Sequence, residues 1–336
     1  MSLGLSRASL ILVCTACTSP QSASPTAPTA PRPPARSGPY LGETAGSAPT
    51  IFGRGLVSRQ HQELNAAFSP SGDELFYTLA DPSRSHYTLL HVQRSADGVW
   101  GEPVVAPFSG RYADADPIFS ADGARLYFIS RRPSDASTAP KDFDIWSVER
   151  TADGWGAPKN LGAPINTPDD EYYVSVTRAG VVYWSRKGDI YRAVPADTQG
   201  GYRVEALPEA VNSKSDEFDP FVAADESYVI FASFRPDSIG SADLYVSFRD
   251  GETWLPSKSL GPLVNSKAFE YCPIMSPDGT HFFFTSYRVP LEDPASRPPA
   301  TLESLLASFD QVENGMGNVY WMKSEFLDTL RGDAPR

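Results

Sequence analysis

The sequence is poor in the residues that build disulfide frameworks and common metal centres. Its 336 residues include 3 cysteines and 4 histidines, and Cys272 is the only cysteine far from the N-terminus. A single cysteine cannot form an intrachain disulfide within the folded part of the chain. Such a residue is more often a small apolar filler than a nucleophile, and we interpret Cys272 in this way. The sequence also lacks His-Glu-x-x-His, Gly-x-Ser-x-Gly and phosphate-binding motifs, so it offers no common catalytic signature.

Basic residues and long apolar runs are scarce as well. Lys and Arg total 29 against 41 Asp and Glu, which gives a formal net charge of −12. A nucleic-acid-binding surface needs a basic stripe, so we exclude a nucleic-acid partner. No segment reaches the ~20 apolar residues of a membrane-spanning helix. The 31 prolines and 25 glycines favour turns and strands over helices.

The N-terminal residues predict export. A short apolar run over 8–13 precedes Thr15-Ala16-Cys17, which resembles a bacterial secretory signal that ends in a lipidation site. We therefore expect a signal peptide over 1–16 and a lipid on Cys17, with cleavage without lipid as the alternative. The lipid would be the only membrane contact, and it would place the protein in the bacterial cell envelope, at the outer membrane or in the periplasm.

The composition then divides the remaining chain. Residues 17–50 are mostly Pro, Ser, Thr, Ala and Gly, which predicts an extended tether behind the lipid. Residues 51–330 have the apolar and aromatic content of a folded domain, and 331–336 form a short tail.

A pattern of roughly fifty residues repeats five times within the folded domain. The copies open with an acidic residue, at Glu63, Asp114, Glu171, Glu217 and Glu270. After a first strand, each copy continues with a turn such as Pro277-Asp-Gly, an aromatic strand such as Leu126-Tyr-Phe-Ile-Ser, and two further strands. Repeats of four antiparallel strands are typical of β-propeller blades. The fifth copy lacks a fourth strand, and residues 51–58 resemble one. We therefore predict an all-β, five-bladed propeller closed by the N-terminal strand.

The same motifs carry a family resemblance. The Asp-Gly turns, the aromatic second strands and third strands such as Asp144-Ile-Trp resemble the TolB-like, WD-repeat-like propellers with Pro-Asp-Gly repeats. The resemblance covers about 51–325 and implies the propeller fold. It implies no single function, because such repeats occur in scaffolds, periplasmic binding proteins and peptidase-attached propellers.

Charged residues are expected to gather on one face of the ring. The leading acids should meet there with the residues that follow the second strands, which in four blades are Arg131, Arg186, Arg235 and Arg288. One interpretation is a set of ion pairs that hold the blades in register. The other is a ligand site at the channel mouth, where Asp116 and Asp219 add oxygen ligands that suit Ca²⁺. Since no contiguous Ca²⁺-binding loop occurs, we expect no cofactor, with Ca²⁺ as the one candidate metal.

The same face should carry the insertions. The longest, 288–317, contains Leu302, Leu305, Leu306 and Phe309 at helical spacing, which indicates either a lid or a partner-binding element. The third blade has only Arg186-Lys-Gly at this position, and the resulting notch is a candidate ligand entrance.

These observations predict a binding or scaffold module for an envelope protein or glycan, without catalysis. The alternative is a glycosidase-like hydrolase that uses two channel-mouth carboxylates.

Overall fold

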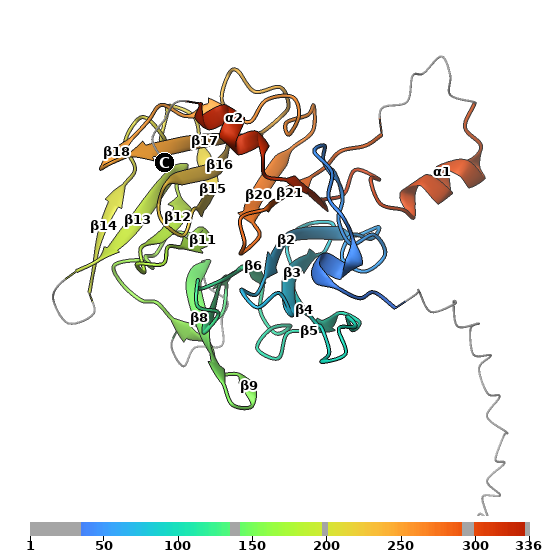
Figure 1. The fold of residues 1–336 in the computed structure, drawn as a ribbon, viewed down its shortest axis with the longest axis horizontal. Helices are drawn as coiled ribbons and strands as arrows, with labels where there is room; N and C mark the ends of the chain where they lie inside the picture. Colours follow the sequence, from blue (N-terminus) through green and yellow to red (C-terminus); the bar gives the residue numbers. More distant parts are fainter. Residues whose placement is uncertain (1–34, 135–141, 197–200, 291–298, 333–336) are drawn as a thin grey trace, which may run out of the picture. The chain divides into compact units, whose positions relative to one another are not determined.

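Five antiparallel sheets surround a common centre (Figure 1). The computed structural model describes residues 35–134, 142–196, 201–290 and 299–332. The innermost strands β2, β6, β11, β15 and β20 contact one another in that order, and β20 returns to β2. The predicted five-bladed, all-β propeller is therefore confirmed.

The blades follow the order of the chain. Blade 1 contains β2 (Gln62–Phe68), β3 (Glu74–Ala80), β4 (Tyr87–Gln93) and β5 (Val104–Val105). Blade 2 contains β6 (Asp114–Phe119), β7 (Arg125–Ser130), β8 (Asp144–Thr151), β9 (Gly154–Trp155) and β10 (Lys159–Asn160). Blade 3 contains β11 (Tyr172–Val176), β12 (Val182–Arg186), β13 (Asp189–Pro195) and β14 (Tyr202–Ala206). Blade 4 contains β15 (Glu217–Val222), β16 (Tyr228–Ser233), β17 (Asp243–Asp250), β18 (Thr253–Trp254) and β19 (Lys258–Ser259). In blades 2 and 4 the outer edge is split between two short strands that pair with the same third strand.

Blade 5 joins the two ends of the folded domain. It contains β20 (Glu270–Met275), β21 (His281–Ser286), β22 (Asn318–Lys323) and, from the N-terminal side, β1 (Thr50–Ile51). Thr50 pairs with Trp321 and Ile51 with Tyr320 in antiparallel register. This is the closure by the N-terminal strand that the sequence predicts. Closure pairs part of β22 and leaves the two-residue β1 as the outer edge of blade 5, and such a short edge strand is a poor template for strand addition.

Apolar second strands build the core between the blades. Phe128, Phe231 and Phe283 lie on three of these strands and are fully buried or nearly so. The Asp-Gly turns before these strands are fixed by the aspartate. In the blade 5 turn, Asp278 accepts hydrogen bonds from the Ser276 hydroxyl and the Thr280 N–H, and Gly279 adopts a φ of 71°, which glycine tolerates without steric cost.

Each innermost strand contains a β-bulge two residues after the leading acid. The pairing register shifts at this point in all five blades. The bulged residues have φ between 48° and 55°, in the left-handed region, and are Asn65, Asp116, Tyr173, Asp219 and Cys272. A bulge redirects the side chain that it contains. We call these five residues the inner ring.

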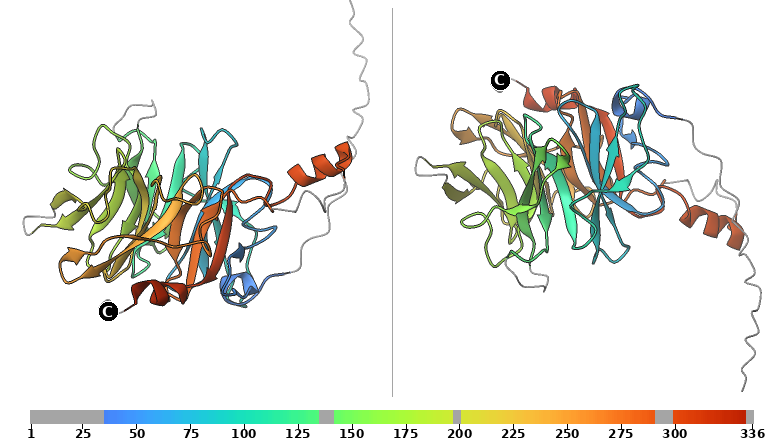
Figure 2. Two further views of the ribbon diagram at one scale, coloured as in Figure 1. Left: turned by 90° about the horizontal axis from the view of Figure 1, so that it is seen from above. Right: turned by 90° about the horizontal axis from the view of Figure 1, so that it is seen from below.

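Several segments lie outside the blades. Residues 36–49, which fall in the segment that the sequence assigns to the tether, include the short 3₁₀ helix Pro39–Gly42. There Leu41 is buried, and the Trp100 indole donates to the Gly38 carbonyl. Helix α2 (Phe326–Arg331) packs across blades 4 and 5 (Figure 2), with Arg331 over the Phe248 ring.

Helix α1 (Leu302–Phe309) forms within the predicted insertion. Thr301 caps it through a reciprocal capping box with Ser304. The apolar stripe is exposed, with Leu302 at 73% and Phe309 at 60%, so the stripe does not pack on the blades as a lid would. None of the described helices has the length and apolar content needed to cross a membrane.

Candidate functional site

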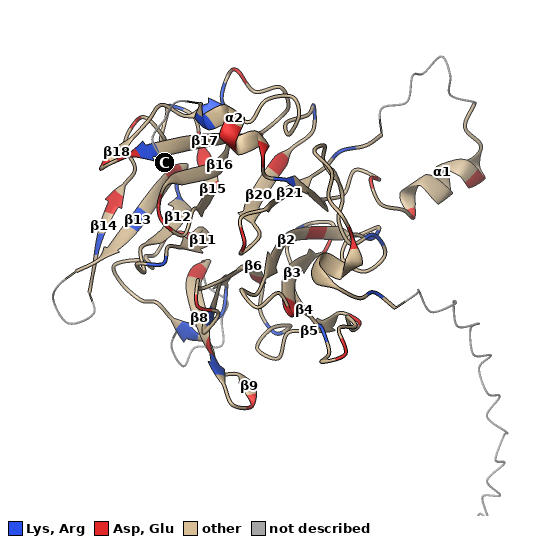
Figure 3. Cartoon of the chain, viewed as in Figure 1, with Lys and Arg blue, Asp and Glu red and all other residues tan. Residues whose placement is uncertain are grey.

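The five leading acids are buried in the scaffold beside the centre of the ring. Glu63 is 1% exposed, and the other four are fully buried. Figure 3 shows acidic positions on innermost strands such as β2 and β20. We call the five acids the outer ring. Their hydrogen-bond and ion-pair partners indicate a structural role.

In blades 4 and 5 the acid is held by an identical set of donors. Glu217 accepts from the Ser213 N–H and hydroxyl, the Ser233 hydroxyl and the Arg235 guanidinium. Arg235 also donates to the carbonyl of Val211, in the link from the previous blade. Blade 5 repeats this set with Ser266, Ser286, Arg288 and Val264 around Glu270. We call each acid with its set of donors a clamp. Each clamp connects two strands of one blade to the link from the preceding blade.

Blade 2 contains the same clamp with a different arginine from the one the sequence suggested. Arg132, not Arg131, donates to Asp114, with an Nη2–Oδ1 distance of 2.6 Å. Arg131 lies over the Phe143 ring, with its Cζ 4.5 Å from the ring centroid. The difference arises because the arginine must stand two residues after the serine that ends the second strand, as in Ser130-Arg-Arg132.

Blades 1 and 3 hold their acids more weakly. Glu171 accepts from the Thr167 N–H and hydroxyl, and Arg186 Nη1 lies 3.7 Å from its Oε1. Glu63 accepts at Oε2 from the Arg59 N–H and the Asn318 amide, while its buried Oε1 has no hydrogen-bond partner among the described residues. Burial raises the pKa of both carboxyls to about 7.

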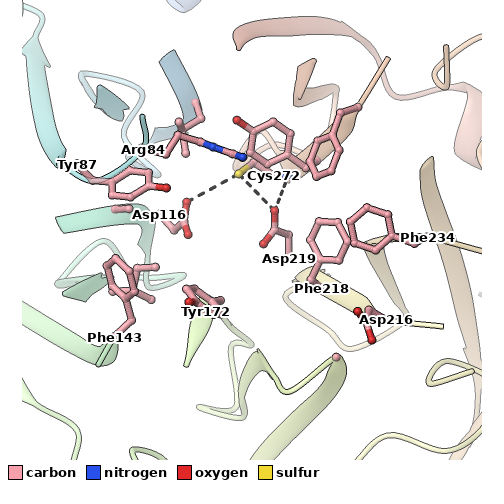
Figure 4. Close-up of a pocket in the computed structure, with 16 residues that line it drawn as sticks. Arg84, Tyr87, Asp116, Phe143, Tyr172, Asp216, Phe218, Asp219, Phe234 and Cys272 are labelled. Atoms are coloured by element: carbon pink, nitrogen blue, oxygen red, sulfur yellow. Dashed lines mark hydrogen bonds between the residues drawn. The ribbon is translucent and has the colours of Figure 1, made fainter. Parts of the chain in front are cut away.

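The inner ring, by contrast, faces the channel. Asp116 and Asp219 are 7% and 8% exposed, and neither makes an ion pair with Lys or Arg in the part of the chain that the structure describes. The Cys272 thiol lies between them, with Sγ 3.8 Å from Asp116 Oδ1 and 3.5 Å from Asp219 Oδ2 (Figure 4). The Cys272 N–H also donates to Asp219 Oδ2, at 3.1 Å. Two carboxylates therefore share one weak donor.

Their environment disfavours negative charge. Burial raises the pKa of Asp219 to about 6. Burial and, after it, the neighbouring Asp219 charge raise the pKa of Asp116 well above its usual range. Burial and the two carboxylates raise the pKa of the Cys272 thiol as well, so this thiol is a poor nucleophile. The sequence predicts an apolar filler at Cys272, whereas in the structure its thiol contacts both acids, and no sequence pattern signals these contacts.

The remaining two members of the inner ring, Asn65 and Tyr173, are buried next to the site and are not among the residues that line its pocket. The Tyr173 hydroxyl reaches across from blade 3 and donates to the Pro273 carbonyl of blade 5, at 2.5 Å. The Asn65 side chain hydrogen-bonds Asp116, and its buried Oδ1 has no partner among the described residues.

A pocket of about 350 Å³ lies above Asp116, Asp219 and Cys272, and every blade contributes to it. It opens on the face that carries the blade-to-blade links and the loops between second and third strands, because Asp216, Phe269 and Gly188 line it. Gly188 is the residue of the notch predicted in blade 3. A side chain there would meet the Asp216 carboxylate, since a Cβ atom would lie 2.4 Å from its Oδ1.

Aromatic rings form two walls of the pocket. The first wall consists of Tyr87, Phe143 and Tyr172, and the second of Phe218, Phe234 and Phe269. Within each wall the rings contact their neighbours, with centroid distances of 5.1–6.1 Å. Figure 4 shows Tyr87 and Phe143 of the first wall on one side of the two aspartates and Phe218 and Phe234 of the second on the other.

The predicted site residues therefore separate into two groups. Asp116 and Asp219 line the pocket, whereas the outer ring and its arginines Arg186, Arg235 and Arg288 do not. No described cluster of three or more His, Cys, Asp or Glu has the geometry to hold a metal ion. Cys17 and the predicted signal peptide lie outside the described residues.

Comparisons with known proteins do not assign this chain to a family. No family model matches the sequence, and no curated protein matches it. Among solved structures, a candidate TolB from Agrobacterium tumefaciens has a TM-score of 0.45 at 16% identity, over 78% of this chain and 90% of that one. Prolyl oligopeptidase B from Galerina marginata has a TM-score of 0.38 at 15% identity, over 67% of this chain and 30% of that one. Puromycin hydrolase has a TM-score of 0.38 at 13% identity, over 79% and 42%. These similarities are weak, and the fold assignment rests on the strand pairing of this chain.

Proposed function

We propose that this protein is an exported binding module of the bacterial cell envelope, tethered by a lipid on Cys17, and that its channel-mouth pocket takes the end of a glycan. The observation that carries the proposal is a pocket to which all five blades contribute lining residues. The sheets and the outer-ring clamps fix this geometry before any ligand arrives, which lowers the entropic cost of binding.

The size and lining of the pocket favour a glycan end over a protein surface. A volume of about 350 Å³ is at the low end of the range for small-molecule sites. It suits one or two sugar rings, and the aromatic walls can stack against their apolar faces. A protein partner would need a broader surface, and the exposed stripe of α1 is the other place where one could dock.

Binding without catalysis fits the chemistry of the inner ring. The Cys272 thiol has no histidine partner among its described contacts and is buried between two acids. A glycosidase is the second candidate, because Asp116 and Asp219 both have raised pKa values and a general acid needs such a shift. Against it, both carboxylates are engaged with the same cysteine rather than held apart on two sides of a substrate bond.

Calorimetry with cell-envelope oligosaccharides and an assay with chromogenic glycosides separate the two functions. A binding module gives saturable heat with no release of the chromophore, and Asp219→Asn changes affinity alone. Turnover that is lost in both Asp116→Asn and Asp219→Asn would establish the hydrolase instead. If no saccharide binds and a lysate protein is captured only when the α1 stripe is intact, the glycan proposal is wrong.

A further inference from the structure

The base of the pocket offers acceptors and very few donors. Asp116 and Asp219 present carboxylate oxygens to the pocket. Next to Asp116, behind the pocket lining, the Oδ1 of Asn65 has no partner among the described residues, and this side chain is only 2% exposed. The donors that reach the two carboxylates are the Cys272 thiol, the Cys272 N–H and the Asn65 side chain, and all of them are already engaged. A ligand that satisfies this group of acceptors must bring its own N–H or O–H donors.

The charge of the base is not balanced by the protein. In the outer ring, by comparison, four of the acids have an arginine within 4.0 Å. Arg84 is the only Lys or Arg among the lining residues that the structure describes. It is exposed at the rim, where its guanidinium donates to the Tyr287 hydroxyl and lies over that ring. Within the described ranges of the chain, the two buried carboxylates therefore have no cationic partner, which such groups normally require.

The walls favour a positive charge in the same place. Aromatic rings have a negative face, and a cation within about 6 Å of a ring centroid is attracted to it, more strongly when both are removed from water. Rings from both walls flank the two aspartates (Figure 4). Carboxylates below and rings on two sides provide the electrostatic surroundings of an ammonium group.

We propose that the pocket binds a ligand through a protonated primary amine, with the ammonium held by Asp116 and Asp219 between the two aromatic walls. This inference rests on the proposed function, because it concerns the same pocket and names the group that is recognised. Two sources share this chemistry, namely an amino sugar at the end of an envelope glycan and a free aliphatic amine. An ammonium ion supplies three donors for the acceptors at the base and the charge that they lack.

Binding should expel a proton. In the empty pocket the raised pKa values leave the carboxyl pair partly protonated near neutral pH, and an ammonium ion replaces that proton. The titratable and charged side chains around the pair, from all packed elements, are Cys272, Tyr87, Tyr172, Tyr173, Tyr271, Asp216 and Arg84. The tyrosines and the thiol have pKa values raised by burial and stay neutral below pH 8, so the carboxyl pair accounts for the proton released.

The test is calorimetry on the full chain with matched probes. Methyl β-glucosaminide is compared with methyl β-glucoside, and n-butylamine with 1-butanol, at pH 6.5 in two buffers of different ionisation enthalpy. We expect each amine to bind at least tenfold more tightly than its neutral partner, with release of close to one proton. Tighter binding of the glucosaminide than of butylamine identifies the amino sugar as the source, and the reverse identifies the free amine.

Substitutions at the two aspartates test whether the amine binds in this pocket, and a substitution at an exposed aspartate serves as the control. Asp219→Asn and Asp116→Asn should each weaken amine binding at least tenfold, while Asp122→Asn, in an exposed turn, should leave it unchanged. Unfolding curves confirm that the variants fold.

Three results would overturn the inference in distinguishable ways. Equal affinity for glucosaminide and glucoside would reject amine recognition and keep the glycan site. Binding of Ca²⁺ that depends on Asp219, without amine binding, would replace the amine with a metal ion. No binding by any probe to a folded protein would reject both the inference and the proposed function.

Discussion

Glu63 and Glu270 occupy equivalent outer-ring positions, yet their replacement by glutamine should have opposite effects. In the described part of the chain Glu63 makes no ion pair with an arginine side chain, although the charge of Arg59 acts on it, and its Oε1 has no hydrogen-bond partner there. Burial raises its pKa to about 7, against about 4.3 in an unfolded chain. Ionising this group in the folded state therefore costs on the order of 3 kcal/mol.

The sign of the pH dependence follows from the raised pKa. The contribution of Glu63 to stability is present at low pH and is lost as the pH rises through about 7. Glu63→Gln removes this loss and keeps an amide oxygen for the Arg59 and Asn318 donors. The variant should match the wild type near pH 4, below the pKa of the unfolded chain, and exceed its free energy of unfolding by up to about 3 kcal/mol at pH 9.

Glu270→Gln provides the control. Both oxygens of Glu270 are hydrogen-bonded, and Arg288 forms an ion pair with it. The neutral glutamine leaves the half-buried Arg288 guanidinium without its counter-ion, so the substitution should lower the free energy of unfolding by about 3 kcal/mol. Urea unfolding at pH 5.5, 7 and 9 measures all three proteins. A Glu63→Gln variant that is less stable than the wild type at pH 9, or whose difference from the wild type does not change with pH, would refute the reasoning.

Four further outcomes follow from the same contacts. Arg132→Ala should lower the free energy of unfolding by about 3 kcal/mol, because it breaks the buried pair with Asp114, whereas Arg131→Ala should cost about 1 kcal/mol or less; equal losses in urea unfolding would contradict the assignment. Cys272 should react with iodoacetamide only as fast as the protein unfolds, since burial raises its thiol pKa and leaves it 2% exposed; rapid labelling of the native protein in a mass-spectrometric time course would argue against this. Asp219→Asn should gain stability relative to the wild type as the pH rises through about 6, and thermal melts at pH 5 and 8 would show no such gain if the carboxyl pair ionised freely. Leu305→Glu, on the exposed stripe of α1, should change stability by less than about 0.5 kcal/mol, and a larger loss would mean that the helix packs on the blades.

The fold was predictable because each blade repeats the same local signals. The turn residues, the aromatic second strand and the leading acid recur in the same order. One copy alone would be weak evidence for a propeller blade, but five copies together are strong evidence for a propeller. The position of the closing strand followed from counting, since the last copy is one strand short and Ile51 supplies it. The clamps were predictable in kind, because acids and arginines that repeat at one end of a blade must meet.

The choice of arginine in blade 2 could also have been made from the sequence. In blades 2, 4 and 5 the acid and its arginine are separated by 18 residues, which selects Arg132 and excludes Arg131. Closeness to the serine that ends the second strand cannot select the arginine in blade 2, because Ser130 is followed by two arginines. The 18-residue separation from the acid is therefore the better criterion. A constant separation measures the length of the hairpin between the two groups, and that length decides which side chain reaches the acid.

The pocket was harder to predict, because it depends on a backbone distortion. In a regular strand, residues two apart point to the same side, so Asp116 and Asp219 seemed to extend the outer ring. The left-handed bulge breaks this alternation and turns them into the channel. Only the structure shows that the two acids leave the clamps and meet Cys272.

The inner ring also separates what the fold requires from what a ligand requires. The left-handed backbone repeats in all five blades, although its residues are Asn, Asp, Tyr, Asp and Cys, and such a conformation costs energy for any of them. The outer ring behaves in the opposite way, since every member is Glu or Asp with donors fixed around it. A scaffold that needed only the bulge would be served best by asparagine or glycine, which tolerate left-handed backbone. Two buried aspartates without a cation are a poor choice for stability alone, and this is why we assign their charge to the ligand rather than to the ring.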